Sequence, residues 1–204
     1  MLFLDFKEKM YELVCFGVHQ IYNWQPDFNN NNLTRWTEKG YIVKLRNGFY
    51  SFPEFINIPG ANLYIGNRIY KPSYISLHYA MNFYGIIPES VVIITSVSSL
   101  KTITFKNPFG TFSYQSIKPV LLFGYDEKPY QKMVVKFASP EKAILDLLYL
   151  YPFYNSEKDM EQLRFDGSVL ENTISRETLH NYLDQFKSKA LENRINLLMK
   201  VYQL

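Results

Sequence analysis

The sequence contains a single cysteine, Cys15, so it can form neither an internal disulfide nor a metal cluster built from thiolates. Histidine is also scarce. The three histidines, His19, His78 and His180, fall in different predicted elements, which disfavours a histidine-based metal site. Cys15 follows an amphipathic stretch that is predicted to be helical. It is expected to lie at the end of that helix as a small buried apolar residue.

Long apolar runs are absent as well. No stretch approaches the roughly 20 residues that a bilayer-spanning helix needs. Two acidic residues, Asp5 and Glu8, interrupt the apolar N-terminal stretch, unlike the pattern of a signal peptide. We therefore expect a cytoplasmic protein that does not associate with a membrane.

Motifs of common enzymes are missing too. The chain has no glycine-rich phosphate loop, no His-Glu-x-x-His pair and no Gly-x-Ser-x-Gly elbow. The segment 166–168, Asp-Gly-Ser, resembles a fragment of a nucleotidyltransferase signature, but the downstream paired aspartates that would hold magnesium are lacking. We interpret it as a loop between helices and expect no enzymatic activity and no cofactor.

Charge is unevenly distributed along the 204 residues, which carry a net charge of +3. Residues 1–56 have six basic and six acidic side chains, residues 57–140 have eight and three, and residues 141–204 have eight and ten. Hydrophobic residues make up 47% and aromatic residues 17%, which is ample for a core. Within residues 29–50, however, four basic side chains, Arg35, Lys39, Lys44 and Arg46, face the one acid Glu38. A local cationic surface of this kind predicts moderate salt dependence if the partner is nucleic acid.

The most informative segment runs from Leu33 to Phe52. Asn47-Gly48 is typical of a two-residue type I′ turn, because both central residues need positive φ. The predicted register places Leu45 opposite Tyr50 and Val43 opposite Phe52 on an apolar face, with Lys44, Arg46 and Ser51 on the other. This pattern predicts a β-hairpin with a cationic outer face.

A short helix is predicted immediately before this hairpin. Leu33 and Trp36 are spaced to bury one side, and Gly40 suits a C-terminal cap. Asn31, Arg35 and Lys39 recur on another side. The candidate DNA contacts on the helix and hairpin are Asn31, Asn32, Thr34, Arg35, Lys39, Lys44, Arg46 and Asn47. The alternative is that the asparagines only form a polar loop and helix start.

Two further helices are predicted upstream, one carrying Phe3, Phe6, Met10 and Leu13 at helical spacing and one from Gly17 to Trp24, before Pro26. The order of helix, helix, helix and hairpin predicts a winged helix-turn-helix domain in residues 1–56. A mixed α/β domain with C-terminal helices is predicted in residues 57–204. The expected fold class is therefore α+β.

The second domain is predicted to begin with a linker, Gly60–Lys71, followed by a helix that Ser73 caps and Gly85 ends. His78 in that helix is interpreted as a hydrogen-bonded core residue, with catalysis as the alternative. Predicted strands are Val91–Val97, Thr102–Phe105, Thr111–Gln115, Val120–Phe123 and Met133–Phe137, the second and third forming a hairpin.

Ser139-Pro140-Glu141 is a favourable helix start, with a hydroxyl cap, proline at the first position and an acid in the first turn. Asp146 lies among leucines further along. We interpret its carboxylate as an anchor for backbone amides or a cation, with catalysis as the alternative. Three more helices are predicted near Asp159–Arg164, Arg176–Phe186 and Ala190–Tyr202.

Three blocks together, LTRWTEKGYIVKLRNGFYSF, RIYKPSYISLHYAMNFYGIIPE and FASPEKAILDLLYLYP, resemble the AbiEi-type antitoxins of bacterial type IV toxin–antitoxin systems. The resemblance covers about residues 1–165. It implies an N-terminal winged helix that represses its own operon promoter, followed by an antitoxin domain. It also implies a nucleotidyltransferase-like toxin that is neutralised without a stable complex.

By the same resemblance, residues 68–89 and 137–152 mark the antitoxin domain, and its motif residues are Ser73, His78, Pro140, Glu141, Lys142 and Asp146. Two alternatives remain open. One is a free-standing winged-helix regulator with a ligand-sensing second domain, and the other is a nuclease that uses Asp146 and Glu141. The oligomeric state, the operator and the identity of the toxin stay open.

Overall fold

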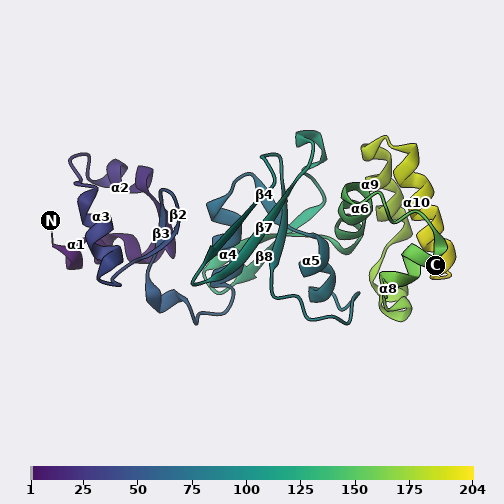
Figure 1. The fold of residues 1–204 in the computed structure, drawn as a ribbon, viewed down its shortest axis with the longest axis horizontal. Helices are drawn as coiled ribbons and strands as arrows, with labels where there is room; N and C mark the ends of the chain where they lie inside the picture. The colour runs from purple at the N-terminus through teal and green to yellow at the C-terminus, as the bar shows by residue number, and fades with distance from the viewer. Residues whose placement is uncertain (1) are drawn as a thin grey trace.

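The computed structural model describes residues 2–204 and arranges them as three groups of elements that follow one another along the long axis (Figure 1). The two ends of the chain lie at opposite ends of that axis. In the described residues, ten α-helices and two sheets form a mixed α+β fold, as the sequence predicted. No helix in the part of the chain that the structure describes is both long and apolar enough to cross a membrane.

The N-terminal group consists of three helices and a small antiparallel sheet. Its elements are α1 (Phe3–Met10), β1 (Cys15–Gly17), α2 (Val18–Trp24), α3 (Asn31–Glu38), β2 (Val43–Arg46) and β3 (Phe49–Ser51), with strand order β1-β3-β2. The three predicted helices are confirmed. The predicted position of Cys15 at the end of the first helix is wrong, because this residue lies in β1, paired with Ser51. The first helix ends in a short 3₁₀ turn at Leu13, and the chain then joins the sheet.

The hairpin of β2 and β3 turns at Asn47-Gly48 as predicted, but the turn is not of type I′, because Gly48 has a positive φ of +76° and Asn47 does not. Its register is different. The observed pairs are Arg46 with Phe49, Lys44 with Tyr50 and Val43 with Ser51. Leu45 is therefore an extra residue on β2, a β-bulge, which reverses the expected alternation of side chains beyond it.

The position of Ser51 also differs from the prediction. It was expected on the outer face, but it is fully buried, and its hydroxyl donates to the Val14 carbonyl at 2.6 Å. The pairing of β3 with β1 accounts for the burial, since the sheet has three strands and β3 is the central one. A hairpin considered alone could not show this.

The N-terminal group has its own cluster of buried apolar side chains. The rings of Phe6 and Trp36 lie 4.7 Å apart at its centre. The buried members are Phe6, Met10, Phe16, Ile21, Phe28, Leu33, Trp36, Ile42 and Phe52. A fully buried side chain of this size contributes about 1.5–3 kcal/mol of transfer free energy. The cluster therefore holds α3 by its Leu33 and Trp36 side.

The central group is built on a six-stranded mixed sheet. Its elements are α4 (Ala61–Ile69), β4 (Ser73–Ile75), α5 (Leu77–Phe83), β5 (Ile94–Ser98), β6 (Ile103–Asn107), β7 (Gly110–Ser116), β8 (Tyr125–Tyr130) and β9 (Met133–Ala138). The strand order is β6-β7-β5-β4-β9-β8. The pairs β4–β9 and β5–β7 are parallel, and the others are antiparallel. The predicted hairpin of β6 and β7 is confirmed.

Two predictions at the start of this group are wrong. The segment Gly60–Lys71 is mostly the helix α4, although its glycine and asparagines are typical of a linker. Gly66 serves packing instead, since a Cβ there would lie 3.2 Å from the Phe112 ring. Ser73 does not cap a helix but lies in β4, because pairing with β5 and β9 outweighs the local capping pattern. The next helix, α5, begins at Leu77.

Two predictions around β8 are also wrong. The segment Val120–Phe123 was predicted as a strand, but the 3₁₀ helix Pro119–Leu121 occupies its first half and the rest is irregular. The strand β8 was not predicted, because Asp126, Glu127 and Lys128 leave no apolar alternation. It lies at the edge of the sheet, where one side of a strand needs no partner and charged residues are common.

The C-terminal group is helical, with α6 (Pro140–Leu150), α7 (Glu157–Gln162), α8 (Gly167–Thr173), α9 (Arg176–Phe186) and α10 (Lys189–Val201). The predicted start of α6 is confirmed: Ser139 Oγ accepts from the backbone N–H of Lys142 at 3.2 Å. The segment 166–168 is not a loop but the start of α8. Asp166 caps that helix by accepting from the N–H groups of Ser168 and Val169 at 3.0 and 3.1 Å.

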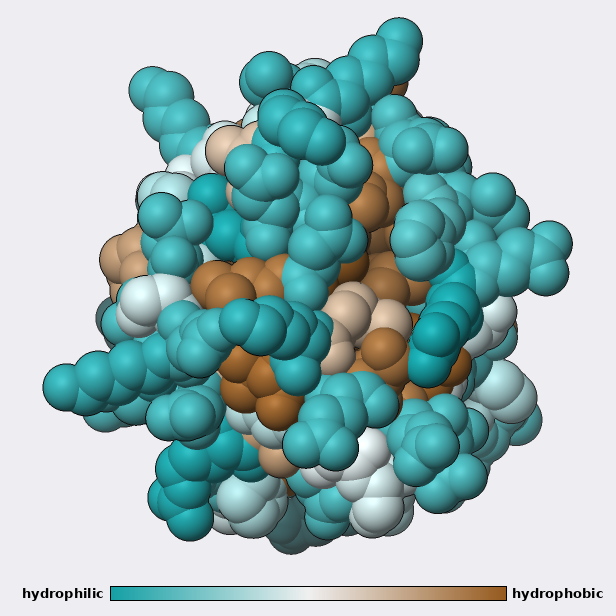
Figure 2. All heavy atoms as spheres, turned by 90° about the vertical axis from the view of Figure 1, so that its right-hand side faces the viewer, coloured by the Kyte–Doolittle hydropathy of each residue, from teal (hydrophilic) through white to brown (hydrophobic). Residues whose placement is uncertain are grey.

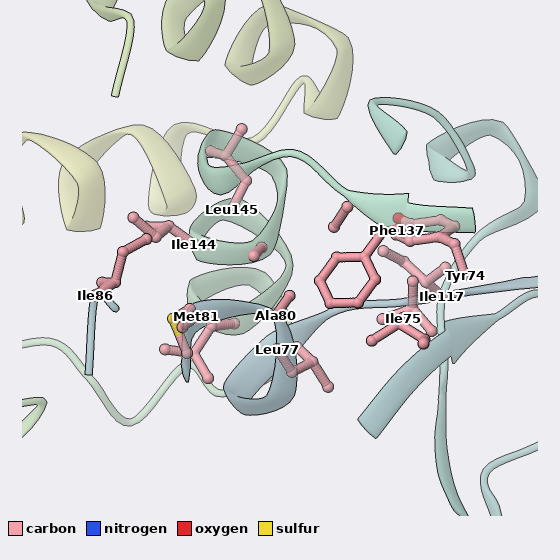
Figure 3. Close-up of a cluster of buried hydrophobic side chains, with 14 of the residues drawn as sticks. Tyr74, Ile75, Leu77, Ala80, Met81, Ile86, Ile117, Phe137, Ile144 and Leu145 are labelled. Carbon is pink, nitrogen blue, oxygen red and sulfur yellow. The ribbon is translucent and has the colours of Figure 1, made fainter. Parts of the chain in front are cut away.

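The helix α6 is the centre of the second hydrophobic core, and every residue from Glu141 to Leu148 is buried. It packs against α5 and β9 on one side and against α9 and α10 on another. Figure 3 shows α5, with Ala80 and Met81, beside α6, whose Ile144 side chain lies next to Ile86. The C-terminal helices therefore cover a helix that is itself packed on the sheet group.

The C-terminal end of the molecule presents a face of mixed character. Apolar side chains gather at its centre and polar side chains surround them (Figure 2). In α10, Leu197 and Val201 pack against the core but are only partly buried.

Candidate functional site

The outer face of α3 collects most of the predicted DNA-contacting residues. Asn31, Thr34, Arg35 and Lys39 are exposed, while Leu33 and Trp36 are 3% exposed on the opposite side. Asn32 is half-buried. The exposed residues follow the spacing of one helix face. They therefore present amide, hydroxyl and cationic groups together to solvent.

Hydrogen bonds within α3 order part of this face. Arg35 Nη2 donates to Asn32 Oδ1 at 2.8 Å, one turn earlier. The backbone N–H of Asn31 donates to Asn29 Oδ1 at 2.9 Å, so Asn29 orders the helix start. The asparagine cluster thus has a structural part as well as an exposed one. Arg35 keeps most of its five donors free for another partner.

The hairpin contributes two more exposed polar residues, Lys44 on β2 and Asn47 in the turn. The turn is tied to the helices, because the backbone N–H of Val18 at the start of α2 donates to the Gly48 carbonyl at 2.9 Å. The turn is therefore held by the N-terminal group and does not extend freely into solvent.

Arg46 lies elsewhere. Its guanidinium carbon is 4.9 Å from the ring centre of Phe49, 5.8 Å from that of Tyr70 and 5.5 Å from that of Phe105. Its Nε is buried without a hydrogen-bond partner among the described residues. The predicted outer cation is half-buried between the hairpin and the sheet group, where it contacts rings from three elements.

A second contact joins the same two groups. Asn107 Nδ2, at the end of β6, donates to the Leu45 carbonyl at 3.1 Å. Leu45 and Cys15 also belong to the hydrophobic cluster of the sheet, although both lie in the first 56 residues. The bulge at Leu45 therefore directs an apolar side chain toward the second core.

The second set of predicted residues contains a buried ion pair. Lys142 Nζ donates to Asp146 Oδ1 one turn along α6, and neither side chain is exposed. The other carboxylate oxygen, Oδ2, accepts from the hydroxyls of Tyr74 at 3.0 Å and Ser76 at 2.8 Å. The prediction that Asp146 anchors a cation matches this geometry, but hydroxyls take the place of the expected backbone amides.

Burial governs the ionisation of this cluster. It raises the pKa of Asp146, while Lys142 and the two hydroxyls favour the charged carboxylate. Burial lowers the pKa of Lys142, whose ammonium lies 4.9 Å from the ring centres of both Phe123 and Phe186. Burial, followed by the charge of Asp146, raises the pKa of Tyr74 far above its ordinary value, so this phenol remains a donor.

Glu141 has a different partner from Asp146. Its carboxylate accepts from the backbone N–H of Ser175 at 2.9 Å, just before α9. At the other end of α6, Arg194 of α10 donates through Nε to the Leu148 carbonyl at 2.9 Å. These two hydrogen bonds, the first partly buried and the second buried, fasten α9 and α10 to opposite ends of α6.

The remaining motif residues are dispersed. Pro140 is the first residue of α6. Ser73 is buried in β4, and its hydroxyl has no partner among residues 2–204. His78 lines a separate hollow of about 720 Å³ with Glu89, Thr95 and other residues. Burial lowers the pKa of His78, and Glu89 acts in the opposite direction. The six motif residues thus lie at several separate places in the fold and do not form one site.

Sequence reasoning missed three residues of these networks: Tyr74, Ser76 and Arg194. Tyr74 and Ser76 were assigned to a helix, where they could not both face Asp146. No local pattern indicated that Arg194 reaches the end of α6.

Among residues 2–204, no group of three or more His, Cys, Asp or Glu side chains is arranged to hold a metal ion. In comparisons with known proteins, no family model matches this chain and no curated protein matches it significantly.

Proposed function

We propose that the N-terminal group is a winged helix-turn-helix that binds DNA, with α3 as the recognition helix and the β2–β3 hairpin as the wing. The observation that carries the proposal is the two-sided character of α3. Leu33 and Trp36 anchor it in the N-terminal core, while Asn31, Thr34, Arg35 and Lys39 remain exposed. Amide and guanidinium groups on an exposed helix suit base edges and phosphates in the major groove.

We further propose that the chain acts as an antitoxin of the AbiEi type, which represses its own promoter. The support is the resemblance of the three sequence blocks. The second and third blocks fall on β4, α5 and α6, so the similarity is concentrated where Asp146 joins these elements. In this proposal the toxin is nucleotidyltransferase-like and is neutralised without a stable complex.

DNA binding is tested with the Arg35→Ala/Lys39→Ala variant in mobility-shift assays on the promoter duplex, across a salt series. Each base-edge contact is worth about 1–3 kcal/mol, so the affinity should fall at least about tenfold. If the side chains contact phosphates, the slope of affinity against salt should also fall by about one unit for each cation.

The matched control is Lys101→Ala/Lys118→Ala, which removes two exposed cations from the sheet group. It should bind the duplex as the unmodified chain does. If the α3 variant also binds the duplex as tightly as the unmodified chain, α3 is not the DNA-contacting helix. The antitoxin role is tested separately, by co-expression with a toxin encoded beside this chain. Loss of growth protection in the α3 variant would contradict the assignment of neutralisation to the rest of the chain.

A further inference from the structure

The six-stranded sheet opens between β4 and β9, where the ladder between neighbouring strands is shortest. The ladder of β4 and β9 consists of the single pair Ile75–Phe137. One residue before that pair, the backbone N–H of Lys136 donates to Asn67 Oδ1, a side chain of α4. At this position of β9 an amide side chain thus takes the place of a neighbouring strand.

A cavity of about 480 Å³ lies at this opening, lined by residues of α4, β4, β8 and β9. Four basic side chains line it, Arg68, Lys71, Lys132 and Lys136, against the one acid Glu127. Burial lowers the pKa of Lys71, and the positive charges of Arg68 and Lys136 lower it further. These cations therefore disfavour one another, and an anion between them would relieve the repulsion.

Two buried polar groups in the cavity lining lack hydrogen-bond partners among the described residues. They are Asn67 Nδ2 and Ser73 Oγ, on side chains that are 6% and 7% exposed. Buried polar atoms are paired in the great majority of native structures, so such groups point to a bound species. Their position between α4 and β4 is independent of the surface charges.

Aromatic rings complete the lining. Tyr125 and Tyr74 are stacked with ring centres 4.9 Å apart, and Lys136 Nζ lies 5.0 Å from the Tyr125 ring centre. Tyr64, beneath the guanidinium of Arg68 at 5.6 Å, is the other partly buried ring. The cavity has the size of a small-molecule site and exceeds what a lone inorganic ion would fill.

We infer that this cavity binds a small phosphorylated molecule of nucleotide size. The cations neutralise its phosphate oxygens, Asn67 and Ser73 supply neutral donors, and the tyrosines offer flat surfaces to a ring. A duplex backbone can reach the surface lysines, but it cannot reach side chains that are more than nine-tenths buried. This inference does not depend on DNA binding by α3.

The test is isothermal titration of the full chain with inorganic pyrophosphate and with ADP. Saturable binding at one site per chain is expected at ligand concentrations of about 1 mM or below. Tighter binding of ADP would assign the tyrosines to the ring, and equal binding would assign recognition to the phosphates alone. The first result supports the inference, and the second would overturn the nucleotide size that it gives to the ligand. The absence of saturable binding for both probes would overturn it.

Variants locate the site. Arg68→Gln/Lys71→Gln should weaken binding at least about tenfold, because charge-assisted hydrogen bonds are lost. Ser73→Ala should weaken it severalfold and, if the double variant does not fold, carries the test together with Lys136→Gln. The control Lys101→Gln/Lys118→Gln removes the same charge and should bind normally. Unchanged binding in folded cavity variants, or displacement of ADP by duplex DNA, would overturn the assignment.

Discussion

The guanidinium carbon of Arg46 in β2 lies 5.5 Å from the ring centre of Phe105 in β6. This contact connects the hairpin of the N-terminal group to the sheet, beside the hydrogen bond from Asn107 to the Leu45 carbonyl. A residue that the sequence placed among the DNA contacts is thereby part of the junction between two groups of elements.

Arg46→Ala should therefore lower the stability of the folded chain more than its DNA affinity. Desolvated cation–π contacts are worth up to about 2 kcal/mol, so the free energy of unfolding should fall by about 1–2 kcal/mol. Lys44→Ala, at an exposed neighbouring position, should change it by less than about 0.5 kcal/mol. Urea unfolding of both variants provides the measurement. A normal unfolding midpoint combined with lost DNA binding in Arg46→Ala would show that Arg46 contacts DNA.

Removing one partner of the buried pair in α6 should be costly. Asp146→Leu leaves the Lys142 ammonium buried without its carboxylate, and breaking such pairs costs about 3–5 kcal/mol. The double variant Lys142→Met/Asp146→Leu removes both charges and should recover much of that loss. Urea unfolding of the two single variants and the double variant gives the coupling free energy of the pair. Additive effects of the two substitutions would mean that the pair is not a stabilising unit.

Acid should weaken the start of α8 through Asp166. The Ser168 hydroxyl and the N–H groups of Ser168 and Val169 hold the pKa of Asp166 below its usual value. Because the pKa is lower in the folded state, the carboxylate stabilises the fold fully above its unfolded-state pKa of about 4. That contribution is lost as the pH falls through the folded-state pKa.

The comparison for this prediction is Asp166→Ala, studied by urea unfolding between neutral and acidic pH. The stability difference from the unmodified chain should be constant above about pH 5 and shrink on acidification. Asp166→Asn retains a neutral cap, so the pH dependence that Asp166 gives to the free energy of unfolding should disappear in this variant. A difference that stays constant down to the most acidic condition would contradict the role of the carboxylate.

Cys15 should be unreactive in the folded chain. It is 1% exposed, and burial raises the pKa of its thiol to about 12, against the smaller opposing effects of Arg68 and Lys71. Only the thiolate is nucleophilic, so a disulfide reagent at about pH 8 should modify Cys15 no faster than the chain opens. The rate should rise when urea is added. A rapid phase in native buffer would show that the thiol is accessible.

Local patterns predicted the elements whose burial is one-sided. The helix α9 has the predicted bounds, Arg176–Phe186, because Leu179, Leu183 and Phe186 recur at helical spacing between polar residues. The exposed face of α3 was predicted for the same reason. In both cases the residues of one helix are sufficient to predict which of its side chains are buried.

Elements that depend on distant partners were not predicted. The strand β4 forms because β5 and β9 flank it, and a glycine suits position 66 of α4 because the Phe112 ring approaches it closely. The partners of Asp146 follow from the position of β4, so they were missed together with that strand. The bulge that turns Leu45 toward the second core likewise reflects a docking surface that the hairpin sequence does not contain.

The cover over Lys142 has a consequence for the order in which this chain can assemble. The ring of Phe186, at the end of α9, lies against the ammonium of Lys142, and Glu141 beside it holds the residue that precedes α9. During synthesis from the N-terminus, the sheet is complete well before Phe186 leaves the ribosome. Until then the charged pair of α6 stays open to water on that side. The dry environment of the ion pair in α6 is therefore completed by α9, and a nascent chain that stalls before α9 keeps this pair hydrated.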